Sequence, residues 1–223
     1  MSCDVKAHES RHAPLTALAL HRHTTAYAAL VLDGDYEEAS IDGRYECARG
    51  TLVIHPAWHA HGDSFGPGGA TVLNLSLTGH QPDALHAFTV SSVEAFVRLA
   101  NDNPAAAIHA AIEEAQSHTA LSPARWLVRY VEALFDEGRV ETGELARRIG
   151  ISPEHASRAC KAWFGVGPSS LRRESQLRRA ILVLQDGGTP SDAVHEAGFC
   201  DQPHLTRLLK RMTGLTPARL RCA

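Results

Sequence analysis

The sequence predicts an α+β protein of two domains, an N-terminal β-barrel or sandwich and a C-terminal all-α domain, joined by connector helices. Residues 15–78 consist of short β-prone runs separated by turn residues. From about Ser92 onward, apolar residues recur at helical spacing. The charge divides in the same way, because residues 1–120 carry a net charge of −8 and residues 121–223 a net charge of +5. Two halves of opposite charge indicate two different tasks.

Composition limits the class of protein. The chain has 223 residues, of which 44% are hydrophobic and 21% charged, so it can bury globular cores. The first ten residues are polar, and no apolar run approaches the ~18 residues of a membrane span. We therefore expect a soluble, cytoplasmic protein with no membrane partner. The cysteines form no CxxC pair, which predicts reduced thiols and neither a disulfide framework nor a zinc finger.

Four strands are predicted in the N-terminal half, where runs are alternating or β-branched. Their ranges are Leu18–His23, Tyr27–Leu32, Thr51–His55 and Thr71–Leu77. Turn signals rich in glycine and aspartate separate them, at residues 33–35, 42–43, 50 and 66–69. Gly79, Pro82 and a serine pair then interrupt the pattern, so we place the boundary between the two halves at residues 79–91.

Three helices are predicted between this boundary and Gly138. They are Val93–Ala100, which ends at the break of residues 101–104, the alanine-rich Ala105–Gln116, and Pro123–Glu137 with its apolar stripe. The predicted domains are residues 1–85 for the barrel, 86–120 for the connector helices and 121–223 for the all-α domain. The connector is also a candidate homodimer seam, although an alanine-rich helix more often serves internal packing.

A first helix-turn-helix unit is predicted over residues 142–165. Thr142 caps a short helix, Gly150 permits a tight turn, and Ser152 with Pro153 starts a second helix that ends at Gly165. A helix, a glycine turn and a capped helix form the unit that inserts its second helix into the major groove of double-stranded DNA. The polar residues of that second helix are Glu154, His155, Ser157, Arg158 and Lys161.

A second unit repeats this plan. Thr189–Ala197 is a short helix, Gly198 turns the chain, and Asp201 caps a helix that begins at Gln202. Its polar residues are Gln202, His204, Thr206, Arg207, Lys210 and Arg211. A longer helix at Pro168–Gln185 separates the units, so one monomer could contact two major-groove segments roughly 34 Å apart. Ordinary antiparallel helix pairs give similar patterns, but two units with matching caps favour DNA binding.

Residues 140–221 resemble the DNA-binding domain of the AraC/XylS family of transcription regulators. The resemblance rests on ELARRIGISPEHASRACKAWFGVGPSSLRRESQLRRA and on AVHEAGFCDQPHLTRLLKRMTGLTPARLR, above all on the Ala-Gly-Phe-x-Asp-Gln and Gly-Leu-Thr-Pro runs. It implies seven helices, binding of promoter DNA, and RNA polymerase as a candidate partner. Arg158 and Arg207 are then the foremost candidates for base or phosphate contact. The chain departs from the family in the helix interiors, at Ala156, Cys160, Leu205 and Leu209.

Histidines are concentrated in the acidic half, where 11 of the 14 precede residue 120. His21 and His23 lie on one face of a predicted strand, and His59 and His61 repeat the spacing after Pro56. Imidazole pairs from two strands suit a divalent metal, with zinc the first candidate. The alternatives are polar lining of an effector pocket and plain surface.

The same spacing resembles the two motifs of the cupin barrel. His21 and His23 match the HxH of the first motif, and Gly50, Pro56 and His61 match the second. The glutamate that follows HxH in the family is absent, and Tyr27 or Ala28 stands near its place. Regulators of the AraC type commonly carry a cupin-like N-terminal domain, many of which bind an organic effector and no metal. Tyr27 and His55 are therefore candidate effector-pocket residues.

Three functions remain open from the sequence. The favoured one is a transcription regulator whose barrel binds a small-molecule effector or a metal. The second is a metal-dependent cupin enzyme, but no acid–base pair accompanies the histidines, so no catalytic residue is assigned. The third is an effector-independent DNA-binding protein. We expect Glu37, Glu38 and Asp63 to be surface charges. Six further histidines are expected to be solvated, namely His8, His12, His80, His86, His109 and His118.

Overall fold

The structure is a computed structural model that describes residues 7–77, 84–114, 116–117, 121–138 and 140–221. It divides into two compact units, residues 1–122 and residues 123–223, here called the N-terminal unit and the C-terminal unit. The predicted connector, residues 86–120, therefore falls within the N-terminal unit. No helix in the described part of the chain is long and apolar enough to cross a membrane.

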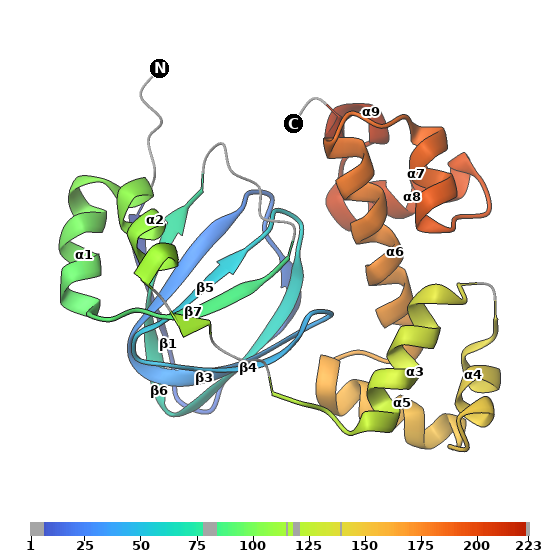
Figure 1. Cartoon of the computed structure of the whole chain (residues 1–223), viewed down its shortest axis with the longest axis horizontal. Helices are drawn as coiled ribbons and strands as arrows, with labels where there is room; N and C mark the ends of the chain where they lie inside the picture. The colour runs from blue at the N-terminus through green and yellow to red at the C-terminus, as the bar shows by residue number, and fades with distance from the viewer. Residues whose placement is uncertain (1–6, 78–83, 115, 118–120, 139, 222–223) are drawn as a thin grey trace. The chain divides into compact units, whose positions relative to one another are not determined.

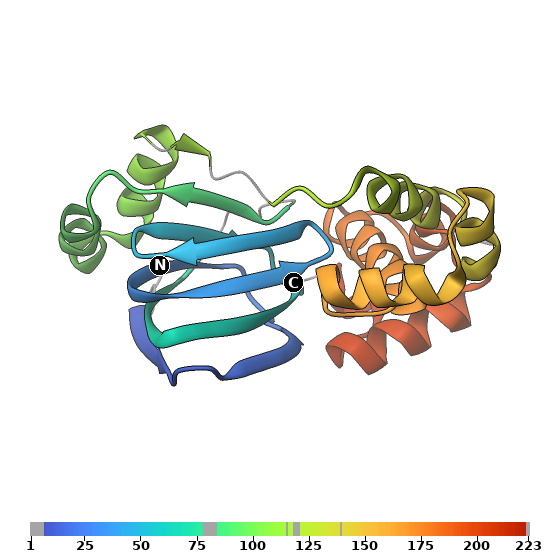
Figure 2. The ribbon, with the colours of Figure 1, turned by 90° about the horizontal axis from the view of Figure 1, so that it is seen from below.

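The N-terminal unit is built on one antiparallel sheet in the order β1-β6-β3-β5-β7-β8, with β2 also paired to β6 and β4 to β3. Figures 1 and 2 show that the sheet curls around an interior. The strands of the described residues are β1 (Ala7–His12), β2 (Ala17–Arg22), β3 (Tyr27–Ser40), β4 (Gly43–Ala48), β5 (Thr51–His55), β6 (Ala60–Ser76), β7 (His86–Thr89) and β8 (Gln116–Ser117).

Two predicted turns are bends inside long strands. The register between β3 and β6 shifts between Val31 and Asp33 and again between Gly34 and Tyr36. Gly34 has a φ of 75° and Gly69 a φ of 68°, and a Cβ at Gly34 would overlap the carbonyl oxygen of Gly69. The turn chemistry at residues 33–35 and 66–69 thus serves bulges that bend a continuous ladder, and the prediction of chain reversals there was wrong.

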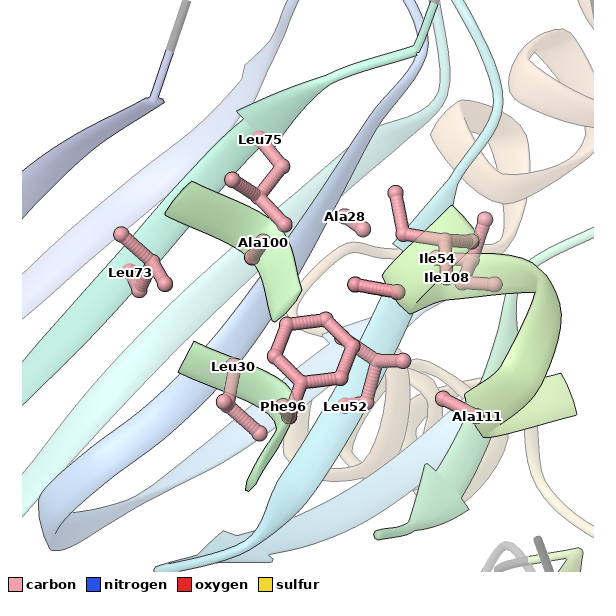
Figure 3. Packing of buried hydrophobic residues seen from close by; sticks show 11 residues of the cluster. Ala28, Leu30, Leu52, Ile54, Leu73, Leu75, Phe96, Ala100, Ile108 and Ala111 are labelled. Carbon is pink, nitrogen blue, oxygen red and sulfur yellow. The ribbon is translucent and has the colours of Figure 1, made fainter. Parts of the chain in front are cut away.

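Strand alternation divides the apolar residues between the two faces of the sheet. One face buries Ala28, Leu30 and Leu52 against α1 (Val93–Asp102) and α2 (Pro104–Glu114), as Figure 3 shows. The helices contribute Phe96, Ala100, Ala107, Ile108 and Ala111 to this core. The other face lines the interior of the curl, where Ala29, Val53 and Phe65 belong to a second cluster. The connector helices are therefore part of the barrel's own packing.

The C-terminal unit is all-helical, with seven helices among its described residues, as the resemblance implied. They are α3 (Arg125–Asp136), α4 (Thr142–Arg148), α5 (Pro153–Phe164), α6 (Pro168–Gln185), α7 (Pro190–Ala197), α8 (Gln202–Thr213) and α9 (Pro217–Leu220). Helix α6 packs against two helices that precede it in the chain, α3 and α5, and against three that follow it, α7, α8 and α9 (Figure 1). Its buried face includes Leu171, Leu177 and Leu184, so α6 is the rigid spacer between the two helix-turn-helix units.

Candidate functional site

The first helix-turn-helix unit consists of α4 and α5. Ser152 Oγ accepts a hydrogen bond from the His155 amide at 3.1 Å, and Gly165 ends α5 in the left-handed region. Burial of Ala156, Cys160 and Phe164 fixes which side of α5 faces the core. The cap of α4 differs from the prediction, because the side chain of Glu141 and not that of Thr142 accepts from the Glu144 amide.

The opposite side of α5 is open to solvent. The structure exposes Glu154, His155, Arg158 and Lys161 and leaves Ser157 half-buried. The His155 ring lies 4.8 Å from the Trp126 ring, between centroids, so this imidazole is partly engaged in packing.

The second unit, α7 and α8, is capped in the same manner. Thr189 and Asp192 form a capping box at the start of α7. Asp201 Oδ1 accepts a hydrogen bond from the His204 amide at 2.6 Å, at the start of α8. The buried residues of α8 are Leu205, Leu208 and Leu209. Its outer face exposes Gln202, His204, Arg207 and Lys210 and leaves Thr206 half-buried.

The arginines of α4 form ion pairs, whereas Arg207 and Lys210 of α8 form none with any of the described residues. Arg147 and Arg148 form ion pairs with Glu144 at 2.9 and 3.3 Å, and Arg148 also pairs with Glu137 at 2.9 Å. Among the residues that the structure describes, no ion pair engages Arg207 or Lys210 within α8 or beyond it. Exposed cations on a capped helix are what phosphate and base contacts require.

The N-terminal unit contains a cavity of about 190 Å³ inside the curled sheet. Side chains of β1, β2, β3, β5 and β6 line it. The lining includes six histidines, Tyr27 and two carboxyl groups. Both predicted effector-pocket residues, Tyr27 and His55, lie in this wall, and their rings stack at 4.3 Å with an interplanar angle of 4°. The Tyr27 hydroxyl and His61 Nε2 are hydrogen-bonded at 3.0 Å.

Three of the four predicted metal ligands come together at this cavity. His21 on β2 is directly opposite His61 on β6, and His21, His23 and His61 each offer a nitrogen within 4.8 Å of the others. His59 is not in this group, and its Nε2 is hydrogen-bonded to Asp42 Oδ2 at 2.9 Å. It precedes β6 and follows Trp58, whose φ is 64°, so the alternation assumed for His59 and His61 does not apply.

A second group of potential ligands lies in the same wall. Glu38, His55 and His61 also offer ligand atoms within 4.8 Å of one another. Nε2 of His55 is hydrogen-bonded to both carboxyl oxygens of Glu38, at 3.0 and 3.1 Å. Local spacing gives no signal for Glu38, because its partner His55 lies on a different strand and is brought to it only by strand pairing.

Two predicted surface charges are buried. The exposed fractions are 1% for Glu38 and 8% for Asp63, whereas Glu37 points away and forms an ion pair with Arg44 at 2.9 Å. Burial raises the pKa of Glu38 to about 8, and burial together with the Glu38 charge raises the pKa of Asp63 to about 8. Alternation along β3 and β6 places both carboxyl groups inside, so the expectation of surface charges was wrong for these two residues.

The buried imidazoles are neutral and have unused ring nitrogens. Burial lowers the pKa of His55 and of His61 well below the ordinary range, with neighbouring histidines adding to the effect. Nδ1 of each of these rings and Oδ1 of Asp63 have no hydrogen-bond partner. Neutral imidazole and carboxylate are the ligands that zinc takes in proteins, so this donor set fits a divalent metal.

The histidines expected to be solvated differ among themselves. His8, His86 and His109 are exposed, while His12 is half-buried and stacks on Phe65 at 4.1 Å. The expectation was therefore wrong for His12. His80 and His118 lie outside the described residues.

Comparison with known proteins shows what the C-terminal unit is similar to. Residues 145–223 match a family model described as a helix-turn-helix domain. The arabinose operon regulatory protein of Salmonella typhimurium is 25% identical over 94 residues, which are 42% of this chain and 34% of that protein. The Escherichia coli protein of the same name is 24% identical over 94 residues, which are 42% of this chain and 32% of that protein. The chain thus matches about a third of the length of these relatives.

Solved structures give a weaker likeness. The crystal structure of ToxT from Vibrio cholerae O395 covers 98% of this chain and 97% of its own, with 7% identity and a TM-score of 0.45. Those values are too low to support a shared effector or activity. The helix-turn-helix match agrees with the two capped units, so the C-terminal unit contains a helix-turn-helix domain, and part of the chain is similar to two arabinose operon regulatory proteins.

Proposed function

We propose that this protein is a sequence-specific transcription regulator that binds promoter DNA through α5 and α8, and whose N-terminal cavity binds a ligand that changes this binding. The observation that carries the proposal is the pair of capped second helices, whose apolar sides are buried and whose cationic sides are open. Two such helices on the rigid α6 spacer suit contact with two major-groove segments.

The cavity supports the sensing part of the proposal. Its wall combines stacked aromatic rings with polar atoms that have no partner, as a ligand-binding site does. A divalent metal at the histidine cluster, with zinc as the first candidate, is the ligand that the donor atoms favour. An organic effector beside the metal, or in its place, is the alternative for a cavity of this size.

The DNA-binding experiment uses the full chain and a duplex selected from a random library by the wild-type protein. Fluorescence anisotropy gives the affinity for this duplex and for a scrambled one, at several salt concentrations. We expect the selected duplex to bind at least about a thousandfold more tightly than the scrambled one at physiological salt. Equal affinity for both would overturn the proposal of sequence-specific regulation.

Two other functions are separated by simple measurements. An effector-independent DNA-binding protein would keep the same affinity after chelation and reloading with Zn²⁺ and in the presence of candidate organic effectors. A cupin enzyme would turn over a substrate in the metal-loaded state, and its acid–base groups would have to come from Glu38 or Asp63. The match to regulators and the open helix faces favour regulation over both.

A further inference from the structure

We propose that Glu38, His55 and His61 are the ligands of the divalent metal in the cavity, with Asp63 beside them as a second carboxylate. The inference deepens the proposed function and rests on its metal-binding part. It assigns the metal to the inner group of side chains, Glu38, His55 and His61, and excludes His21 and His23 as ligands.

The inner group is held rigidly by the sheet. Its three side chains come from β3, β5 and β6, and their ligand atoms lie within 4.8 Å of one another. Their exposed fractions are 1% for Glu38, 1% for His55 and 2% for His61. Side chains fixed in this way need little rearrangement to close on an ion, which favours tight binding.

Two buried carboxyl groups face each other at the inner group. Glu38 and Asp63 are directly opposite each other in the β3–β6 register, where like charges repel. Within the described parts of the chain, Glu38 is paired only with His55 and Asp63 has no ion pair with a lysine or arginine. A divalent cation between them would neutralise both carboxylates in an interior that otherwise penalises each of them.

Several buried nitrogen and oxygen atoms in and around the inner group have no hydrogen-bond partner. Nδ1 of His55 and of His61 and Oδ1 of Asp63 are buried without a hydrogen-bond partner. Buried polar atoms are nearly always satisfied in folded proteins, and a bound ion is one reason for an exception.

The competing group is His21, His23 and His61. It shares His61 with the inner group, so one ion cannot use both sets in a tetrahedral site. His23 is exposed and His21 half-buried, and this group contains no carboxylate. A dication in a poorly hydrated cavity is better stabilised by the group with negative charge, and Glu38 thereby supplies the carboxylate that is absent after His23.

The test measures the Zn²⁺ affinity of the full chain, stripped with a chelator, by competition with a chromophoric chelator. The variants are Glu38→Gln, which keeps the shape and removes the charge, and a His21→Ala/His23→Ala double substitution. Glu37→Gln is the matched control, since this neighbouring carboxylate lies on the same strand and pairs with Arg44. Circular dichroism verifies folding, and His55→Asn replaces Glu38→Gln if the latter does not fold.

We expect Glu38→Gln to weaken Zn²⁺ binding by at least about tenfold and to alter the visible spectrum of bound Co²⁺. The double histidine variant and Glu37→Gln should bind Zn²⁺ as the wild type does. The reverse ranking would overturn the inference and leave a metal site at the cavity mouth. No Zn²⁺ binding by the wild type would overturn the inference and the metal part of the proposed function together, while the DNA-binding experiment would still decide the regulatory part.

Discussion

Glu38 on β3 and Asp63 on β6 face each other across the antiparallel ladder, with both carboxyl groups buried inside the curled sheet. Surface carboxylates separate or pair with cations at little cost, but these two can do neither in the metal-free protein. Because both carboxyl groups are buried, we expect the stability of the N-terminal unit to depend on pH, and the sign of that dependence can be measured.

The metal-free protein should become less stable as the pH rises from about 6.5 to 8. Burial raises the pKa of Glu38 and of Asp63 to about 8, so over this window the unfolded state has lost protons that the folded state retains. The lowered pKa values of His55 and His61 act in the opposite sense, but only below pH 6.5.

Thermal unfolding of the chelator-treated protein at pH 6.5 and pH 8 measures this effect. The Glu38→Gln/Asp63→Asn double variant should show a smaller change, because neither side chain then titrates. A wild-type midpoint that rises over this window would show that the two carboxyl groups are ionised at neutral pH and that their environment differs from the one described.

Replacing Arg158 or Arg207 by alanine should weaken binding to the selected duplex. Arg158 and Arg207 are exposed on α5 and α8, and loss of a base contact costs about 1–3 kcal/mol per residue. Anisotropy titrations of Arg158→Ala and Arg207→Ala give these values. Arg98→Ala is the matched control, since Arg98 is an exposed helical arginine of the N-terminal unit. Wild-type affinity in both variants would exclude α5 and α8 as the contacting helices.

Salt dependence separates phosphate contacts from base contacts. Lys210 is exposed in the last turns of α8, and a lysine that neutralises one phosphate contributes about 0.9 to the slope of log affinity against log salt. Lys210→Ala should therefore reduce the slope by about one unit and weaken selected and scrambled duplexes alike. An unchanged slope would place Lys210 away from the backbone.

The helix caps should contribute to the stability of the C-terminal unit. Ser152→Ala removes the acceptor of the His155 amide at the start of α5 and should cost about 1 kcal/mol in the free energy of unfolding. Ser169→Ala, at an exposed position of α6, is the control and should change little. Denaturant unfolding compares the two, and equal effects would show that the cap bond at Ser152 is not formed in solution.

Local patterns in the sequence predicted helices in the regions of α1 to α8 and some of the strands, whereas α9 was not among the predicted elements. The bounds of β5 and α6, and the start and end of α5, follow from caps, prolines and glycines next to apolar runs. The long strands β3 and β6 were divided too early, because glycines that serve bulges look like glycines that serve turns. Strand β4 lacked a recognised apolar pattern, although its register with β3 is regular.

Only the part of the candidate site that has a local sequence motif could be predicted. His21 and His61 were found because each belongs to an HxH pattern, but His59 was grouped with them on the assumption of an unbroken strand. Glu38 and Asp63 carry no local signal that separates them from surface charges. Only the β3–β6 register shows that both face inward, and register depends on contacts distant in the sequence.

The role of α1 can be tested by two substitutions on one helix. Phe96 is 6% exposed and packs into the core formed with the sheet, so Phe96→Ala should cost about 3–5 kcal/mol in the free energy of unfolding. Leu99 on the same helix is 38% exposed. If a second copy of the chain covers this face, Leu99→Ala should weaken self-association in sedimentation experiments and leave monomer stability nearly unchanged. If both variants keep the wild-type oligomeric state and only Phe96→Ala loses stability, α1 serves the barrel core alone, and a homodimer must use another surface.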